Sequence, residues 1–197
     1  MTIEEYIEAM SSPENEVLAQ ITRDTYVHIL NPHMLSGQVQ GRVLSMLSKM
    51  IRPRRILELG TFTGYSALCL AEGLTPDGKL ITIEHNDELE STIRHNLSLS
   101  PLGSRIDLLI GDAIEILSAG NGPIAGEAFD LVFIDPPYHA GMYEEILSKV
   151  FLFDILNDGG IILVESMRGE SLPPAEAPYV RGKTYSYGKI SLTVYSR

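Results

Sequence analysis

Two hydrophobic periodicities divide this chain, and they meet near residue 53. Over residues 2–51 the apolar positions recur at helical spacing, which predicts a run of helices. The clearest series is Val39, Val43, Leu44, Met46, Leu47, Met50 and Ile51. A helix start is indicated at Ser12, Pro13 and Glu14, where a capping hydroxyl precedes a proline in the first turn. The breaker-rich segment 31–37 separates the helices.

Beyond residue 53, strand-like and helix-like segments alternate. Strands are expected at residues 54–60, 79–84, 106–111, 129–135 and 160–165, with helices at 65–74, 87–99, 113–118 and 142–157. The strands are nearly continuous apolar runs, which is typical of a parallel sheet covered by helices on both faces. Near the C-terminus, two strand-like stretches flank residues 187–189 and predict a hairpin at the sheet edge.

These elements predict an α/β fold. We expect a Rossmann-like, doubly wound, mostly parallel sheet with a terminal antiparallel hairpin and an N-terminal helical cap. The cap is expected over residues 1–52 and the core over residues 53–197, as one compact domain overall. An antiparallel element at the end of such a sheet argues against a plain dinucleotide-binding dehydrogenase.

Composition restricts the class of protein. The 197 residues carry a formal net charge of −11, which opposes sequence-independent binding to nucleic-acid backbones. No apolar run approaches the roughly 20 residues that cross a bilayer, and the acidic N-terminus and lone Cys69 favour a cytoplasmic protein. Residues 168–197 differ, because five basic side chains against two acidic ones give +3 and leave −14 for the rest. That tail is either a solvated edge or a contact for an anionic substrate.

The first expected strand leads into a glycine-containing turn with the spacing Glu-x-Gly-x-x-x-Gly, at Glu58, Gly60 and Gly64. Such a turn lets a ligand approach the backbone and the N-terminus of the following helix. An acid just before the glycine would repel a diphosphate, but it suits the ammonium of an amino-acid group. The Ser66 hydroxyl and the helix N-terminal amides suit its carboxylate.

The next two strands also end in acids. Glu84 is placed to accept both hydroxyls of a ribose, and Asp112 to accept from an adenine amino group. Ligands of open α/β sheets bind at the carboxyl ends of the strands, where these three acids should meet. An amino acid, a ribose and an adenine together describe S-adenosylmethionine.

At this point the chain resembles the class I methyltransferases over residues 54–197, and its front half resembles the catechol-type O-methyltransferases. The segments that carry the narrower resemblance are 11–14, 34–41, 56–68 and 78–84. The resemblance implies that Met34 and Ser36 lie beside the cofactor, that the cap encloses the acceptor, and that the cap supports a homodimer. The residues expected to contact the cofactor are Met34, Ser36, Glu58, Gly60, Gly64, Tyr65, Ser66, Glu84, His85, Asp112, Ala113 and Asp135.

That family holds a divalent cation with an Asp after the fourth strand and an Asp-Asn pair after the fifth, and a Lys helps to deprotonate the hydroxyl. Asp135 matches the first ligand, but the pair reads Glu165-Ser166 and Tyr138 stands in place of the Lys. Hard cations prefer clustered oxygen ligands, so Asp135 and Glu165 form a candidate Mg²⁺ site that lacks the usual amide.

The second half of the chain instead resembles enzymes that methylate guanine N2 in ribosomal RNA, through Asp135-Pro136-Pro137-Tyr138, residues 160–166 and the hairpin at 187–189. In such sites the acid and a proline carbonyl accept from an exocyclic amine, and the aromatic ring stacks on the base. The candidate catalytic residues are therefore Asp135, Pro136 and Tyr138. We expect O-methylation of a small hydroxylated aromatic molecule. The alternatives are N-methylation of a nucleobase amine in RNA, and a non-catalytic cofactor-binding module.

Overall fold

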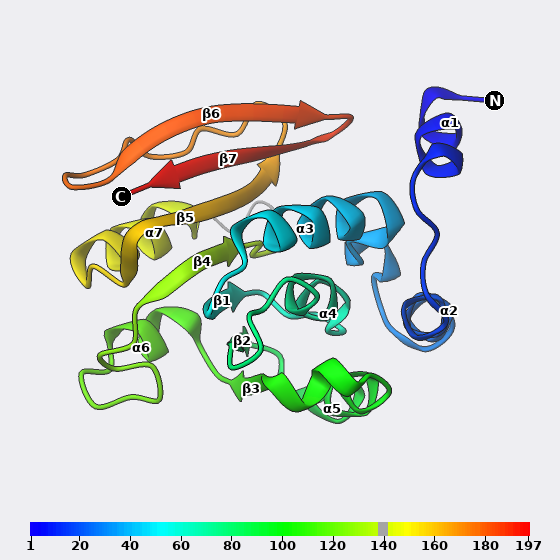
Figure 1. Ribbon diagram of the computed structural model, residues 1–197, viewed down its shortest axis with the longest axis horizontal. Coiled ribbons are helices and arrows are strands. Elements are labelled where there is room, and N and C mark those ends of the chain that lie inside the picture. The colour runs from blue at the N-terminus through cyan, green and yellow to red at the C-terminus, as the bar shows by residue number, and fades with distance from the viewer. Residues whose placement is uncertain (138–141) are drawn as a thin grey trace.

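Figure 1 shows the computed structural model, which describes residues 1–137 and 142–197. The cap consists of α1 (Ile3–Met10), α2 (Glu16–His28), the 3₁₀ helix η1 (Pro32–Met34) and α3 (Gly37–Ile51). The helix start predicted at Ser12 is wrong. Helix α2 begins instead at Glu16, because the Asn15 side chain accepts a hydrogen bond from the Leu18 N–H and caps the first turn.

The core is a seven-stranded sheet in the order β3-β2-β1-β4-β5-β7-β6. Its strands are β1 (Arg55–Leu59), β2 (Lys79–Glu84), β3 (Ile106–Ile110), β4 (Phe129–Ile134), β5 (Leu156–Met167), β6 (Val180–Tyr187) and β7 (Ile190–Ser196). The five strands from β3 to β5 are parallel, whereas β7 runs antiparallel to both β5 and β6. This confirms the Rossmann-like fold and its terminal hairpin. The strand order reverses between β1 and β4, and ligands of such sheets bind at that switch point.

Helices cover both faces of the sheet. They are α4 (Tyr65–Ala71), α5 (Glu90–Ser98), α6 (Ala113–Ser118) and α7 (Tyr143–Leu152), with short 3₁₀ helices η2 (Asp87–Leu89) and η3 (Pro101–Arg105). One hydrophobic cluster lies between the sheet and α3, α4 and α5, and the other lies between the sheet and α6 and α7. No helix of the described residues is long and apolar enough to cross a membrane.

Two predicted boundaries shift for reasons of packing. The helix expected at 142–157 ends at Leu152, because Phe129 of β4 pairs with Leu156 and draws residues 156–159 into β5. The helix expected at 65–74 ends at Ala71. Gly73 lies so close to α3 that a Cβ there would be 2.2 Å from the carbonyl carbon of Ser48.

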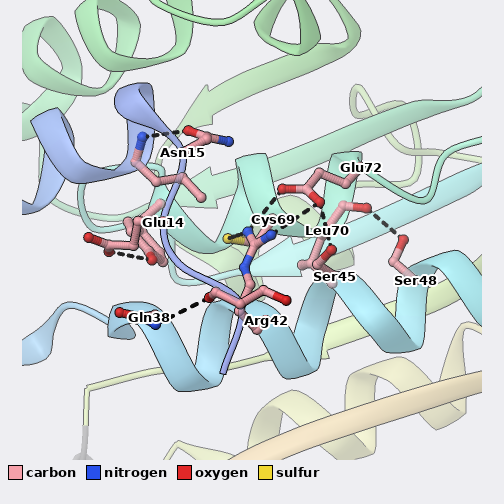
Figure 2. Close-up of polar contacts among 12 residues, drawn as sticks. Glu14, Asn15, Gln38, Arg42, Ser45, Ser48, Cys69, Leu70 and Glu72 are labelled. Atoms are coloured by element: carbon pink, nitrogen blue, oxygen red, sulfur yellow. Dashed lines mark hydrogen bonds and ion pairs between the residues drawn. The ribbon is translucent and has the colours of Figure 1, made fainter. Parts of the chain in front are cut away.

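The cap is fixed to the core where α3 packs on α4 (Figure 2). Glu72 accepts from Arg42 at 2.9 Å, from Ser45 at 2.7 Å and from Lys49 at 2.6 Å. Burial raises the pKa of the neighbouring Cys69 thiol to about 12, so this cysteine is an unreactive core residue. This polar junction holds α3 in place over the core.

Candidate active site

The glycine turn lies directly against the end of β4. Gly60 has a φ of +99°, and a Cβ at this position would lie 2.2 Å from the backbone oxygen of Asp135. Two backbone hydrogen bonds fix the approach: the Asp135 N–H donates to the Leu59 oxygen at 3.0 Å, and the Gly60 N–H donates to the Ile83 oxygen at 3.0 Å. The turn therefore needs a glycine at position 60, both for its conformation and for space.

Glu84, at the end of β2, holds this turn. One of its carboxylate oxygens accepts from the backbone N–H groups of Thr61 at 3.2 Å and Phe62 at 2.8 Å, and the other accepts from Asn86 at 2.8 Å. A carboxylate has about four acceptor positions, so capacity for a ribose hydroxyl remains. The contact of Glu84 with a ribose stays a prediction. The structure shows that Glu84 also fixes the backbone of the glycine turn.

Glu58 is fully buried beneath the turn. Its Oε2 accepts from the Thr82 hydroxyl at 2.6 Å, whereas Oε1 has no hydrogen-bond donor among the described residues. Burial raises the pKa of Glu58 to about 7, helped by the charge of Glu84 and opposed by the nearby hydroxyls of Thr82 and Ser66. A buried acceptor without a donor fits a ligand that brings its own N–H groups, such as an ammonium.

The adenine end of the predicted site is built at the start of α6. Asp112 accepts from the backbone N–H groups of Ile114 at 2.8 Å and Glu115 at 3.0 Å, and thereby caps the helix that begins at Ala113. Its second oxygen lies 3.8 Å from Nδ1 of His85, whose side chain is exposed. These residues lie together beyond the ends of β2 and β3, as the sequence predicts. Contact with a base stays a prediction.

Three other predicted cofactor residues have different surroundings. The Tyr65 ring is buried in the junction between cap and core, where its hydroxyl donates to Glu14 at 2.6 Å, so only its backbone is oriented by the turn. Met34 is 41% exposed in η1, and Ser36 is partly buried just before α3. The predicted contacts of Met34 and Ser36 with the cofactor stay predictions, and the Tyr65 ring belongs to the packing between cap and core.

An acid pair lies at the ends of β4 and β5. Burial, followed by the charges of Glu165 and Glu58, raises the pKa of Asp135 well above its usual range. Glu165 is 2% exposed and accepts from the Nε2 of Gln40, on α3, at 2.5 Å. Pro136 is buried beside Asp135, whereas Tyr138 lies outside the described residues. The structure thus brings the predicted acids of three strands, Glu58, Asp135 and Glu165, to one edge of the sheet.

These acids fit a hard cation only in part. Within residues 1–137 and 142–197, no three His, Cys, Asp or Glu side chains converge as metal ligands. Gln40 also occupies one face of the Glu165 carboxylate. The Mg²⁺ site at Asp135 and Glu165 therefore stays a prediction, and we assign no chemical step to a metal.

Two residues of this region were missed in the sequence. Gln40 stands 125 positions from Glu165, and nothing local marks the contact. Tyr143, at the start of α7, is 3% exposed, and its hydroxyl forms no hydrogen bond with the described residues. Burial and the charges of Asp135, Glu170 and Glu165 raise its pKa. Its place next to the Pro-Pro segment was the only sequence signal.

Comparisons with known proteins agree with this architecture. A model of a family described as O-methyltransferase matches residues 8–168. A catechol O-methyltransferase of Mycobacterium tuberculosis is 36% identical over 104 residues, which are 53% of this chain and 46% of that protein. A caffeoyl-CoA O-methyltransferase of Petroselinum crispum is 31% identical over 175 residues, which are 85% of this chain and 70% of that protein. The chain thus spans about half to 70% of the length of these curated relatives.

Among solved structures, the O-methyltransferase TomG of Streptomyces achromogenes, in complex with SAM, superposes with a TM-score of 0.81 at 22% identity. The match covers 100% of this chain and 99% of that one, and at this identity it shows the shared fold. The predicted resemblance to ribosomal RNA methyltransferases in the second half is not shown by these comparisons. The family match over residues 8–168 decides the assignment: the chain belongs to the O-methyltransferase family.

Proposed function

We propose that this protein is an S-adenosylmethionine-dependent O-methyltransferase that acts on a small hydroxylated aromatic acceptor. The observation that carries the proposal is the convergence of Glu58, Glu84 and Asp135 on the Gly60 turn at the switch point of the sheet. The buried Oε1 of Glu58, which has no donor in the described part of the chain, fits the amino-acid end of this cofactor. The family assignment and the names of the curated relatives support the hydroxyl as acceptor.

S-adenosylmethionine, when bound, supplies an electrophilic methyl group. In the proposal, Glu58 holds the ammonium, Glu84 the ribose and Asp112 the adenine edge, which leaves Asp135 facing the acceptor. Methyl transfer is an in-line displacement that depends mainly on alignment of a nucleophile about 3 Å away. The acceptor hydroxyl must lose its proton, and Asp135 offers a carboxylate next to the cofactor turn that can accept it. We therefore assign that role to Asp135.

One observation favours a second candidate. The sequence Asp135-Pro136-Pro137, followed by Glu165-Ser166 where the catechol-type pattern has an Asp-Asn pair, suits an exocyclic amine that donates to an acid and to a proline carbonyl. This would make the protein an N-methyltransferase of a nucleobase in RNA. The net charge of −11 weighs against an RNA partner, so the small-molecule acceptor is preferred. A cofactor-binding module without turnover is the remaining alternative.

The test combines binding with turnover. Calorimetry should show micromolar-range binding of S-adenosylmethionine, strongly weakened in Glu84→Ala and unchanged in the matched surface variant Glu16→Ala. Catechol and undermodified RNA are then offered as acceptors, each with and without a chelator. Methylation of catechol supports the proposal, and loss of this activity with the chelator would show that the reaction requires a metal ion. Methylation of the RNA amine alone would favour the N-methyltransferase instead. Cofactor binding without methylation of catechol or RNA would favour the non-catalytic cofactor-binding module.

We also propose a homodimer formed through the cap, and a cytoplasmic location. Helix α1 presents one apolar face at i, i+3, i+4 and i+7 that is largely exposed: Ile3 at 71%, Tyr6 at 51%, Ile7 at 44% and Met10 at 69%. Light scattering of the wild type and of Ile3→Glu tests the dimer, because a charge on this face should yield a monomer.

A further inference from the structure

A basic and aromatic surface lies beside the acid pair, along the terminal hairpin. This hairpin surface consists of Arg168, Lys183, Tyr185, Tyr187 and Lys189, all of which are exposed. None of its three cations forms an ion pair with a described residue. The tail that carries them is positive in a chain with a net charge of −11, so these charges await an external anion or stay solvated.

Strand register places the two tyrosines on the same sheet face as Glu165. Glu165 of β5 pairs with Leu192 of β7, and Leu192 pairs with Tyr185 of β6. Directly paired residues project to the same face, and two strand spacings separate Glu165 from Tyr185 by about 10 Å. The next row on this face is Met167, Ile190 and Tyr187. Tyr185 and Tyr187 therefore form an aromatic surface on the same face of the sheet as Glu165, two strands away from it.

Two of the cations, Arg168 and Lys189, lie at the turn end of this aromatic surface, whereas Lys183 lies two residues before Tyr185 on β6. The backbone N–H of Arg168 donates to the Lys189 oxygen at 2.8 Å, which joins the end of β5 to the hairpin turn. In Figure 1 this turn lies at the same end of the sheet as the tips of β4 and β5. Glu170, two residues beyond Arg168, makes no ion pair with it. The acids Glu58, Asp135 and Glu165 lie at the ends of β1, β4 and β5, across β7 from the tyrosines, and they repel anions from the reacting centre.

We propose that the hairpin surface is a subsite for an anionic group on the acceptor. The acceptor class is then a hydroxylated aromatic that carries a carboxylate or phosphate at the end away from the oxygen to be methylated, with its apolar body along Tyr185 and Tyr187. This rests on the proposed function and deepens it. A small anion is favoured over an RNA backbone, because the chain as a whole carries a net charge of −11, which opposes binding of an extended polyanion.

The test compares acceptors that differ only in the anion. Catechol, 3,4-dihydroxycinnamate, its neutral methyl ester, and a phosphate monoester of 3-(3,4-dihydroxyphenyl)propanol are assayed with the wild type, with Arg168→Gln/Lys189→Gln, and with Arg52→Gln. Arg52 is an exposed cation that forms no ion pair with any described residue, and it lies before β1, at the opposite edge of the sheet. We expect the double substitution to raise KM about five- to tenfold for the anionic acceptors at unchanged kcat, and less than twofold for the neutral ones.

The effect should shrink as salt rises from 20 to about 300 mM, because exposed charges are screened. A larger effect on the phosphate than on the carboxylate would identify the phosphate as the natural group. Turnover of catechol with no preference for the anionic acceptors, or with equal KM changes for charged and neutral ones, would overturn the inference and leave the proposed function standing. Turnover of none of these acceptors would overturn both, as would methylation confined to RNA.

Discussion

Cofactor affinity should depend on pH through Glu58, which is fully buried and has a pKa raised to about 7. Ammonium binding requires the ionised carboxylate, so below pH 7 binding must first remove a proton. The ionised fraction rises from about 3% at pH 5.5 to about half at pH 7.0, which predicts about fifteenfold tighter binding across this interval, or about 1.6 kcal/mol. The ligand's own α-amino group stays protonated over this range, since its pKa lies near 8.

The assay is calorimetry of S-adenosylmethionine binding at four pH values between 5.5 and 7.0, in buffers of different ionisation enthalpy. Glu58→Gln is the matched variant, because it keeps the shape of the side chain and removes its titrating carboxyl. We expect the variant to bind more weakly, with little dependence on pH. Near pH 6 the wild type should release about one proton on binding.

The stability of the ligand-free protein should also depend on pH through Glu58, in a direction that can be measured independently. Because the folded-state pKa of Glu58 is raised, its contribution to the free energy of unfolding is fully present below about pH 4.5 and is lost as pH rises through 7. A shift from 4.5 to about 7 corresponds to about 3 kcal/mol. Glu58→Gln should not show this loss. Equal pH slopes for wild type and variant, in binding and in stability, would refute the reasoning.

Three further substitutions test the site. Gly60→Ala should lower the free energy of unfolding by more than about 2 kcal/mol and abolish cofactor binding. The control Gly126→Ala, at a φ of +75° but with open space around it, should lower the free energy of unfolding by about 1 kcal/mol. Equal losses in urea unfolding would show that the contact with Asp135 can relax. Gln40→Leu removes the donor to Glu165 and should lower kcat about tenfold without changing the Kd for the cofactor. The control is Gln38→Leu, on the same helix. The same kcat in both variants would exclude a role for the contact between Gln40 and Glu165. Tyr143→Phe removes a buried hydroxyl that has no hydrogen-bond partner within residues 1–137 and 142–197, and it should raise the free energy of unfolding by about 1 kcal/mol. A decrease of that size would mean that the hydroxyl is hydrogen-bonded.

The sequence predicted those parts of the fold that depend on local pattern. The predicted bounds of β2 and α6 agree with the structure, because each is an unbroken periodic run with a polar residue at one end, Glu84 at the end of β2 and Asp112 before α6. The predicted start of β5 was wrong, since residues 156–159 join the strand only by pairing with β4. Likewise, both Ser12 and Asn15 are suitable capping residues, and in the structure Asn15 caps the helix.

The candidate site was predictable at the strand ends and unpredictable where the cap meets it. Glu58, Glu84, Asp112 and Asp135 follow apolar runs, so their common edge follows from parallel strand order. The contact between Gln40 and Glu165 joins residues 125 positions apart, and only tertiary packing brings them together. Tyr65 was assigned to the cofactor from its place in the turn, yet its ring fills the space above Gly41 instead.

The most direct test of the proposed activity is the fate of a labelled methyl group. The wild-type protein is incubated with methyl-labelled S-adenosylmethionine and an equimolar mixture of a dihydroxylated aromatic and undermodified RNA. The products are then resolved by mass spectrometry and the position of the label by NMR. We expect the label on a phenolic oxygen, and a strong loss of product in Asp135→Asn. Label found only on a nucleobase nitrogen, or unchanged O-methylation in that variant, would contradict the proposed chemistry.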